Sequence, residues 1–205
     1  MPHQARKAPI PQHLRWMLAL YALLGLGSAL WSLLWDGPSL WSPRPPLLEA
    51  LFDLPGFAQH GLAAFAGAVL GLLLVEASRQ ASRRLLWASK LEEAFAQILG
   101  PMHWRVILML AIASALAEEV LFRGILQPIV GLPLTALAFG LLHIGPNRRY
   151  LPWTAMALGM GFVLGGLLIL TGSLWAPICC HGVINACNLR RISLISLKTA
   201  QRPIL

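Results

Sequence analysis

Charged residues are scarce in this chain of 205 residues: Asp, Glu, Lys and Arg make up only 12% of it, about half the fraction found in soluble domains. Hydrophobic residues make up 57%, and the mean hydropathy is +0.67. These values exclude a disordered chain, a coiled coil and an ordinary cytosolic globular protein. They indicate a polytopic membrane protein.

Cysteine is scarce as well. The three cysteines are odd in number and show no CxxC spacing, which excludes a disulfide framework and a zinc knuckle. Cys180 directly precedes a histidine, but a thiolate would be costly in an apolar helix. We therefore interpret the cysteines as small packing residues.

Six apolar runs are candidate membrane spans, because about 20 helical residues cross a hydrocarbon layer roughly 30 Å thick. They cover residues 14–35, 57–75, 104–126, 132–144, 151–171 and 174–189. The fourth run is short, so we expect protein to shield part of it. The predicted fold is an all-α polytopic membrane bundle of about six transmembrane helices, in which residues 1–205 form a single integral membrane domain.

One further helix is expected outside the spans. Residues 83–99 place four apolar side chains at helical spacing beside charged ones: Leu91, Phe95, Ile98 and Leu99. Such a pattern is typical of an amphipathic helix on the membrane interface. A plain linker helix is the alternative interpretation.

Basic residues are concentrated in alternate loops. Of 16 Lys and Arg residues, 14 lie on one side, and the other two are Arg44 in an opposite loop and Arg123 within a span. Loops rich in Lys and Arg face the cytosol, so we expect both termini to be cytoplasmic. This topology and anionic lipid account for the net charge of +8, and no nucleic-acid partner is expected.

Two adjacent glutamates and one arginine lie within the third predicted span. An ionisable side chain at that depth costs roughly 3 kcal/mol or more and is functional by default. Glu119 and Arg123 are four residues apart on one helical face and can form an ion pair. Glu118 points about 100° away and has no local partner in the sequence. A structural ion cluster that holds helices together is the alternative interpretation.

Three more polar residues lie in apolar runs. His143 ends the fourth run, and His181 and Asn185 share one helical face of the sixth. At a rise of about 1.5 Å per residue, Glu118 and His143 lie about 15 Å below one predicted turn, and His181 about 12 Å below another. Two hairpins thus bring a carboxylate, two imidazoles and an amide to one level. For each residue alone, an interhelical hydrogen bond is the alternative role.

These side chains are suited to hydrolysis of a peptide bond inside the membrane. Glu118 could take a proton from water, and His143 could orient that water. His181 and Asn185 could donate hydrogen bonds to a developing oxyanion. Such a site needs no serine or cysteine nucleophile.

Three motifs contain these residues. Glu118-Glu119-Val-Leu-Phe-Arg123 has the form EExxxR, Phe139-Gly-Leu-Leu-His143 the form FxxxH, and His181-Gly-Val-Ile-Asn185 the form HxxxN. In this order, and each in its own span, they resemble the CPBP family, which includes the CAAX prenyl endopeptidases and the bacteriocin-processing (Abi) proteins. The resemblance covers residues 102–190, the predicted catalytic core, and leaves the first two spans without a motif.

The resemblance implies an intramembrane endopeptidase of glutamate type. In this family pattern Glu118 and His143 activate the water, and His181 and Asn185 form the oxyanion site. No cofactor is expected. A zinc-dependent variant, with His143, His181 and Glu118 as ligands, is the alternative, which we rank below the metal-free site because Asn185 is a poor zinc ligand.

The resemblance also assigns supporting residues and a location. Glu119 and Arg123 would support the catalytic set from behind, and Phe139 would pack beside it. The expected location is a bacterial inner (plasma) membrane, with the lipid bilayer and a membrane protein or peptide substrate as partners. Candidate substrates are C-terminal sorting tails, peptide signals and bacteriocins.

Two other functions compete with the protease. A non-catalytic scaffold or immunity protein of the CPBP fold would have no need of Glu118, His143, His181 and Asn185 together. A proton-coupled transporter with Glu118 as its relay would favour inverted repeats, and the sequence shows none. The substrate, its side of entry and the oligomeric state are left open.

Overall fold

The computed structural model describes residues 10–34, 46–48, 51 and 54–200. Its long helices are α1 (Gln12–Leu34), α3 (Gly56–Arg84), α4 (Leu86–Leu99), α5 (Trp104–Glu119), α6 (Gln127–Leu142), α7 (Leu151–Thr171) and α8 (Trp175–Ala200), with a π-helical segment η1 (Val120–Leu126) and a 3₁₀ turn η2 (Arg148–Tyr150). No strand occurs in these ranges. The predicted all-α helical bundle is confirmed. The end of the first predicted span at Trp35, and Arg44 in the loop after it, lie outside the described residues.

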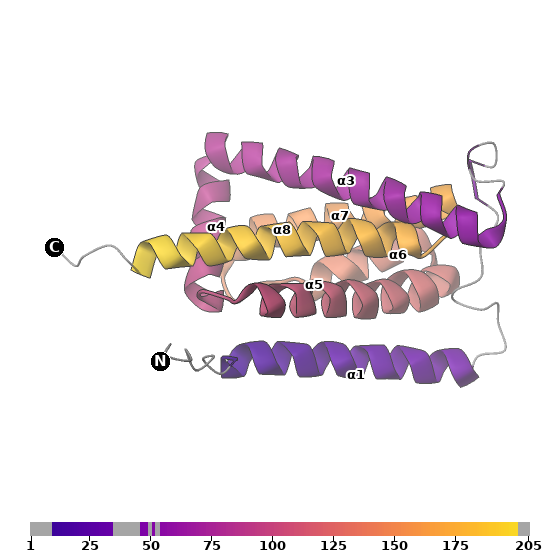
Figure 1. Cartoon of the computed structure of the whole chain (residues 1–205), viewed down its shortest axis with the longest axis horizontal. Coiled ribbons are helices and arrows are strands. Elements are labelled where there is room, and N and C mark those ends of the chain that lie inside the picture. Colours follow the sequence, from indigo (N-terminus) through magenta and orange to yellow (C-terminus); the bar gives the residue numbers. More distant parts are fainter. Residues whose placement is uncertain (1–9, 35–45, 49–50, 52–53, 201–205) are drawn as a thin grey trace, which may run out of the picture.

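The long helices run along one axis of the molecule, and α4 lies across them. Figure 1 shows α1, α3, α5 and α8 along the long axis, with α4 at the end where α1 begins and α8 finishes. α4 buries Leu91 and Leu99 and exposes Trp87 and Ile98. The helix is two-sided, as predicted, but it begins at Leu86 instead of residue 83, because Arg83 and Arg84 end α3. Ile98, which the spacing placed with the buried residues, is exposed instead.

Four helices of the described part are long and apolar enough to cross a membrane: Gln12–Leu34, Gly56–Arg84, Trp104–Leu142 and Arg148–Thr171. The third of these contains both the third and the fourth predicted span. α8, which corresponds to the sixth, is not among them. It packs against α3, α4, α5 and α7, and its polar residues His181 and Ser193 are buried. Its hydropathy can therefore be lower than that of an outer span.

The chain reverses direction at Gly131, inside the stretch Trp104–Leu142. Gly131 has φ 81° and ψ 167°, a conformation open to glycine because it has no Cβ. In a straight helix, Glu118 and His143 would lie about 37 Å apart, yet their side chains approach to 3.8 Å. The third and fourth predicted spans are therefore antiparallel neighbours, as their predicted turn at residues 128–133 requires.

Two pairs of glycines let helices pack closely. A Cβ built on Gly67 of α3 would lie 2.0 Å from the carbonyl oxygen of Ala176 in α8, and one on Gly161 of α7 would lie 2.8 Å from the Cα of Ala136 in α6. A Cβ on Gly71 would lie 2.8 Å from the carbonyl oxygen of Cys180, and one on Gly165 would meet the side chains of Leu132 and Gln127. Gly67 with Gly71, and Gly161 with Gly165, each form a GxxxG pattern, and both patterns serve packing within this chain. The pair in α3 holds α8 in place.

Candidate active site

A buried ion pair between Arg123 and Glu119 lies next to the candidate catalytic residues. Arg123 Nε lies 3.2 Å from Glu119 Oε2, and both side chains are fully buried. This is the pair that their spacing of four residues predicts. Arg123 also donates to the carbonyl oxygen of Gly161 at 3.3 Å, and its guanidinium lies 4.5 Å from the ring centre of Phe139. Arg123 therefore joins η1 to α7 and α6, and Phe139 packs beside it.

His143 is fixed by the backbone of its own helix. Its Nδ1 lies 2.7 Å from the carbonyl oxygen of Phe139. A carbonyl oxygen only accepts, so Nδ1 carries the proton, and the neutral ring presents the lone pair of Nε2. Thr154 donates to the carbonyl oxygen of His143 at 2.9 Å, and the ring of Trp153 packs edge-on at 5.2 Å. The orientation of His143 thus depends on α6 and α7 together.

His181 has the same tautomer for a different reason. Its Nδ1 lies 2.7 Å from Glu119 Oε1, and the carboxylate paired with Arg123 is an acceptor only. The proton is therefore on Nδ1, and Nε2 of the neutral ring is again an acceptor. Glu119 Oε1 contacts His181 and also accepts from Arg123 Nη1 at 3.3 Å, while Oε2 faces Arg123 Nε. Glu119 therefore couples the EExxxR motif to the HxxxN motif.

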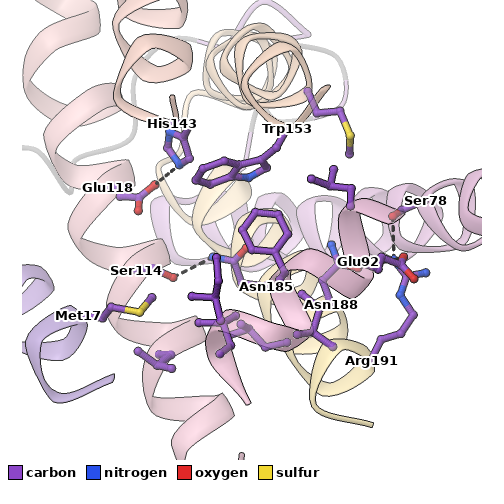
Figure 2. A pocket seen from close by; sticks show the side chains of 18 of the residues that line it. Met17, Ser78, Glu92, Ser114, Glu118, His143, Trp153, Asn185, Asn188 and Arg191 are labelled. Atoms are coloured by element: carbon purple, nitrogen blue, oxygen red, sulfur yellow. Dashed lines mark hydrogen bonds and ion pairs between the residues drawn. The ribbon is translucent and has the colours of Figure 1, made fainter. Parts of the chain in front are cut away.

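Glu118 faces both imidazoles. Its Oε2 lies 3.8 Å from His143 Nε2 and 4.0 Å from His181 Nε2. This oxygen is buried and has no hydrogen-bond partner within the described residues. All three atoms are acceptors in the neutral form of the rings, and the gaps are too long for direct hydrogen bonds but suit a bridging water. Figure 2 shows Glu118 and His143 directed toward each other.

Asn185 is the fourth member of the predicted set. It lies one helical turn after His181 on α8, and its Nδ2 donates to Ser114 Oγ at 2.8 Å. Asn185, Glu118 and His143 line one cavity, as Figure 2 shows. The structure thus brings together Glu118, His143, His181 and Asn185, with Glu119, Arg123 and Phe139 next to them.

Three further residues contact this set and lie outside the three motifs. Ser114 binds Asn185, Thr154 binds the backbone of His143, and the phenol of Tyr21 interacts with the carboxylate of Glu118. Ser114 precedes Glu118 by four residues, so helical spacing alone could have indicated a shared face. Tyr21 comes from α1, and no sequence pattern indicates that α1 reaches the site.

The cavity has a volume of about 680 Å³ and mostly apolar walls, formed by α1, α4, α5 and α8 among others. A second polar group lies away from Glu118. There Arg191 of α8 forms an ion pair with Glu92 of α4 and donates to Ser78 Oγ of α3 at 3.0 Å. Figure 2 shows Ser78, Glu92 and Arg191 grouped apart from Glu118 and His143. Both groups line the same cavity, whose mostly apolar walls suit a ligand with apolar groups.

The zinc-dependent alternative would place a metal ion between His143, His181 and Glu118. Among the described residues, the His, Cys, Asp and Glu side chains form no group of three or more that could hold a metal ion. His143, His181 and Glu118 approach one another without forming such a group. The three cysteines are free, and Cys180 is buried, in agreement with a packing role.

Comparisons with known proteins identify the same region. Residues 100–187 match the family model of type II CAAX prenyl endopeptidase Rce1-like proteins. The uncharacterized protein YpbD of Bacillus subtilis (strain 168) is 37% identical over 87 residues, which are 41% of this chain and 46% of YpbD. The chain thus spans about half the length of this curated relative. No solved structure matches it significantly. The resemblance carried by the three motifs is confirmed: residues 100–187 match the Rce1-like model, which is of CPBP type.

Proposed function

We propose that this protein is an intramembrane endopeptidase in which Glu118 activates a water molecule. One observation carries the proposal: the buried Glu118 Oε2 has no hydrogen-bond partner in the described part of the chain, and two imidazole nitrogens face it at 3.8 and 4.0 Å. A water in this gap can donate one hydrogen to Glu118 and the other to His143 or His181. Its oxygen then keeps a lone pair for attack.

In the proposed reaction, Glu118 accepts a proton from the water as the water oxygen bonds to the carbonyl carbon of the substrate. The carbonyl oxygen becomes an oxyanion in a tetrahedral intermediate. When the C–N bond breaks, the proton held by Glu118 passes to the leaving amine. Water is divided between the two products, and no covalent enzyme intermediate forms.

Asn185 is the direct donor to the oxyanion in this mechanism. A neutral His181 has its only proton on Nδ1, toward Glu119, and so cannot donate from Nε2. It becomes a second donor only as an imidazolium, next to the Glu119 carboxylate. Asn185 has amide hydrogens in any state, and a single donor of this kind contributes about a hundredfold or more to turnover.

The proposed substrates are membrane proteins or peptides, with sorting tails, peptide signals and bacteriocins as candidates. A cavity with apolar walls fits a chain segment that lies in or against the lipid bilayer. The proposed location is a bacterial inner membrane with both termini in the cytosol. These assignments rest on the family match of residues 100–187 and on the apolar helices.

The experiment compares cells that carry the parent protein with cells that carry Glu118→Gln, by mapping new N- and C-termini in the membrane proteome. We expect a set of cleavage products to disappear in the variant, because Gln cannot accept the proton. The matched control is Glu93→Gln, which removes the same charge from an exposed position on α4 and should leave the products unchanged. Identical termini in parent and Glu118→Gln cells, with both proteins equally abundant, would contradict the protease and favour the non-catalytic scaffold.

We further propose that the reaction needs no metal. The proposal rests on Asn185, whose amide is a poor zinc ligand. Purified protein treated with EDTA should cleave a peptide copied from one of the mapped sites at the untreated rate. Loss of activity that added zinc restores would instead favour the zinc-dependent variant of the protease.

A further inference from the structure

Ser114 is a buried serine in α5, one helical turn before Glu118. It is 3% exposed. Its Oγ lies 3.2 Å from the carbonyl oxygen of Ala111 and 2.8 Å from Nδ2 of Asn185. The family motifs do not include this position, and the mechanism above does not use it.

The two contacts of Ser114 determine which group donates in each. A hydroxyl has a single hydrogen, and the carbonyl oxygen of Ala111 can only accept. The hydrogen of Ser114 therefore points to Ala111, and its oxygen accepts from Asn185. This excludes the flipped amide, since an Asn oxygen placed there would face a second acceptor without a hydrogen between them.

The orientation of Asn185 follows from this contact. One hydrogen of Nδ2 is used by Ser114, and the structure gives that nitrogen no other partner in the described residues. Asn185 and Ser114 both line the cavity that Glu118 and His143 share, as Figure 2 shows. The second hydrogen of Nδ2 is thus left for a group in the cavity.

We infer that Ser114 is a positioning residue for peptide hydrolysis, which holds the Asn185 amide so that one N–H meets the oxyanion. The inference rests on the proposed function and deepens it. A donor that must rotate into place during the reaction contributes less than one already oriented. Ser114 acts only through Asn185 and does not contact the reacting atoms.

The experiment measures turnover of an internally quenched peptide that copies a cleavage site found by the terminus mapping. Ser114→Ala should lower kcat about tenfold and leave KM within about twofold, because the oriented N–H acts on the transition state. Ser114→Thr keeps the hydroxyl and should recover most of the rate. Ser193→Ala is the matched control: Ser193 is also buried, but its hydroxyl binds the backbone of Met102. This variant should turn over at the parental kcat.

A double-mutant cycle separates positioning from a structural role. Asn185→Ala alone should lower kcat about a hundredfold, and adding Ser114→Ala should lower it no further, since the residue through which Ser114 acts is gone. A parental kcat in Ser114→Ala, or an equal loss in both backgrounds, would overturn the inference while Glu118→Gln still upholds the protease. If the parent cleaves nothing and Glu118→Gln matches it, the proposed function fails and this inference fails with it.

Discussion

At the scale of residues, two adjacent glutamates have opposite surroundings. Glu119 is fully buried, and its oxygens contact Arg123 and His181. Glu118 next to it has a buried oxygen with no hydrogen-bond partner in the described part of the chain. The Glu119 carboxylate compensates the charge of a buried cation. The Glu118 oxygen without a hydrogen-bond partner is available for chemistry. Substitution of the two glutamates should therefore affect different properties of the protein.

Glu119→Gln should destabilise the fold by about 3–5 kcal/mol, because it leaves the guanidinium of Arg123 buried without a counter-charge. Glu118→Gln should leave stability near that of the parent. Thermal unfolding of the detergent-solubilised proteins measures both. The double variant Glu119→Gln with Arg123→Met removes both charges and should recover most of the loss. Equal unfolding temperatures for Glu119→Gln and the parent would show that the ion pair does not stabilise the fold.

The sequence indicated which side chains meet, but not how they are protonated. Helical spacing places Glu119 beside Arg123 and His181 beside Asn185, and counting from the turns places the two hairpins at one depth. The tautomers depend on contacts between elements: the Phe139 carbonyl for His143 and the Glu119 carboxylate for His181. No pattern along one helix determines such contacts.

At the scale of elements, the position of α8 decides whether the site exists, because α8 carries both His181 and Asn185. α3 packs closely on α8 through Gly67 and Gly71. Two glycines four residues apart are typical of such close helix packing. The sequence did not predict the π-helical turns of η1, because the i to i+5 bonding there arises where Arg123 is held by α6 and α7. Nor did hydropathy predict that α8 would be enclosed by other helices.

Gly67→Ala should destabilise the protein by about 1–3 kcal/mol and lower its peptidase activity. The added Cβ would lie 2.0 Å from the Ala176 carbonyl oxygen, and a backbone atom can yield only if α3 and α8 separate. Gly61→Ala is the matched control on the same helix, since a Cβ there meets nothing within 4 Å. It should be neutral or stabilising, because alanine favours helix more than glycine does. Equal unfolding temperatures for the two variants would contradict the close packing.

At the scale of the whole molecule, the cavity is lined both by the region that matches the family model and by helices that precede it. Residues 100–187 carry the family match, but α1, α3 and α4 also line the cavity. The matched region therefore contains the three motifs, while the helices before it form other walls of the cavity. Those helices differ from the matched region in having no motif, so their role could be found only from the three-dimensional arrangement.

The orientation of the molecule in the membrane decides from which side water and substrate reach this space. The loop with Arg148 and Arg149 is basic, so the positive-inside rule places it in the cytosol. Asn147 in this loop is exposed, and Leu47, in the segment between α1 and α3, is 68% exposed. A membrane-impermeant thiol reagent should label Leu47→Cys in intact cells and Asn147→Cys only after permeabilisation. The parent measures background labelling of Cys179, Cys180 and Cys187. Labelling of Asn147→Cys in intact cells, with Leu47→Cys protected, would reverse the orientation and place the basic loop on the outer face.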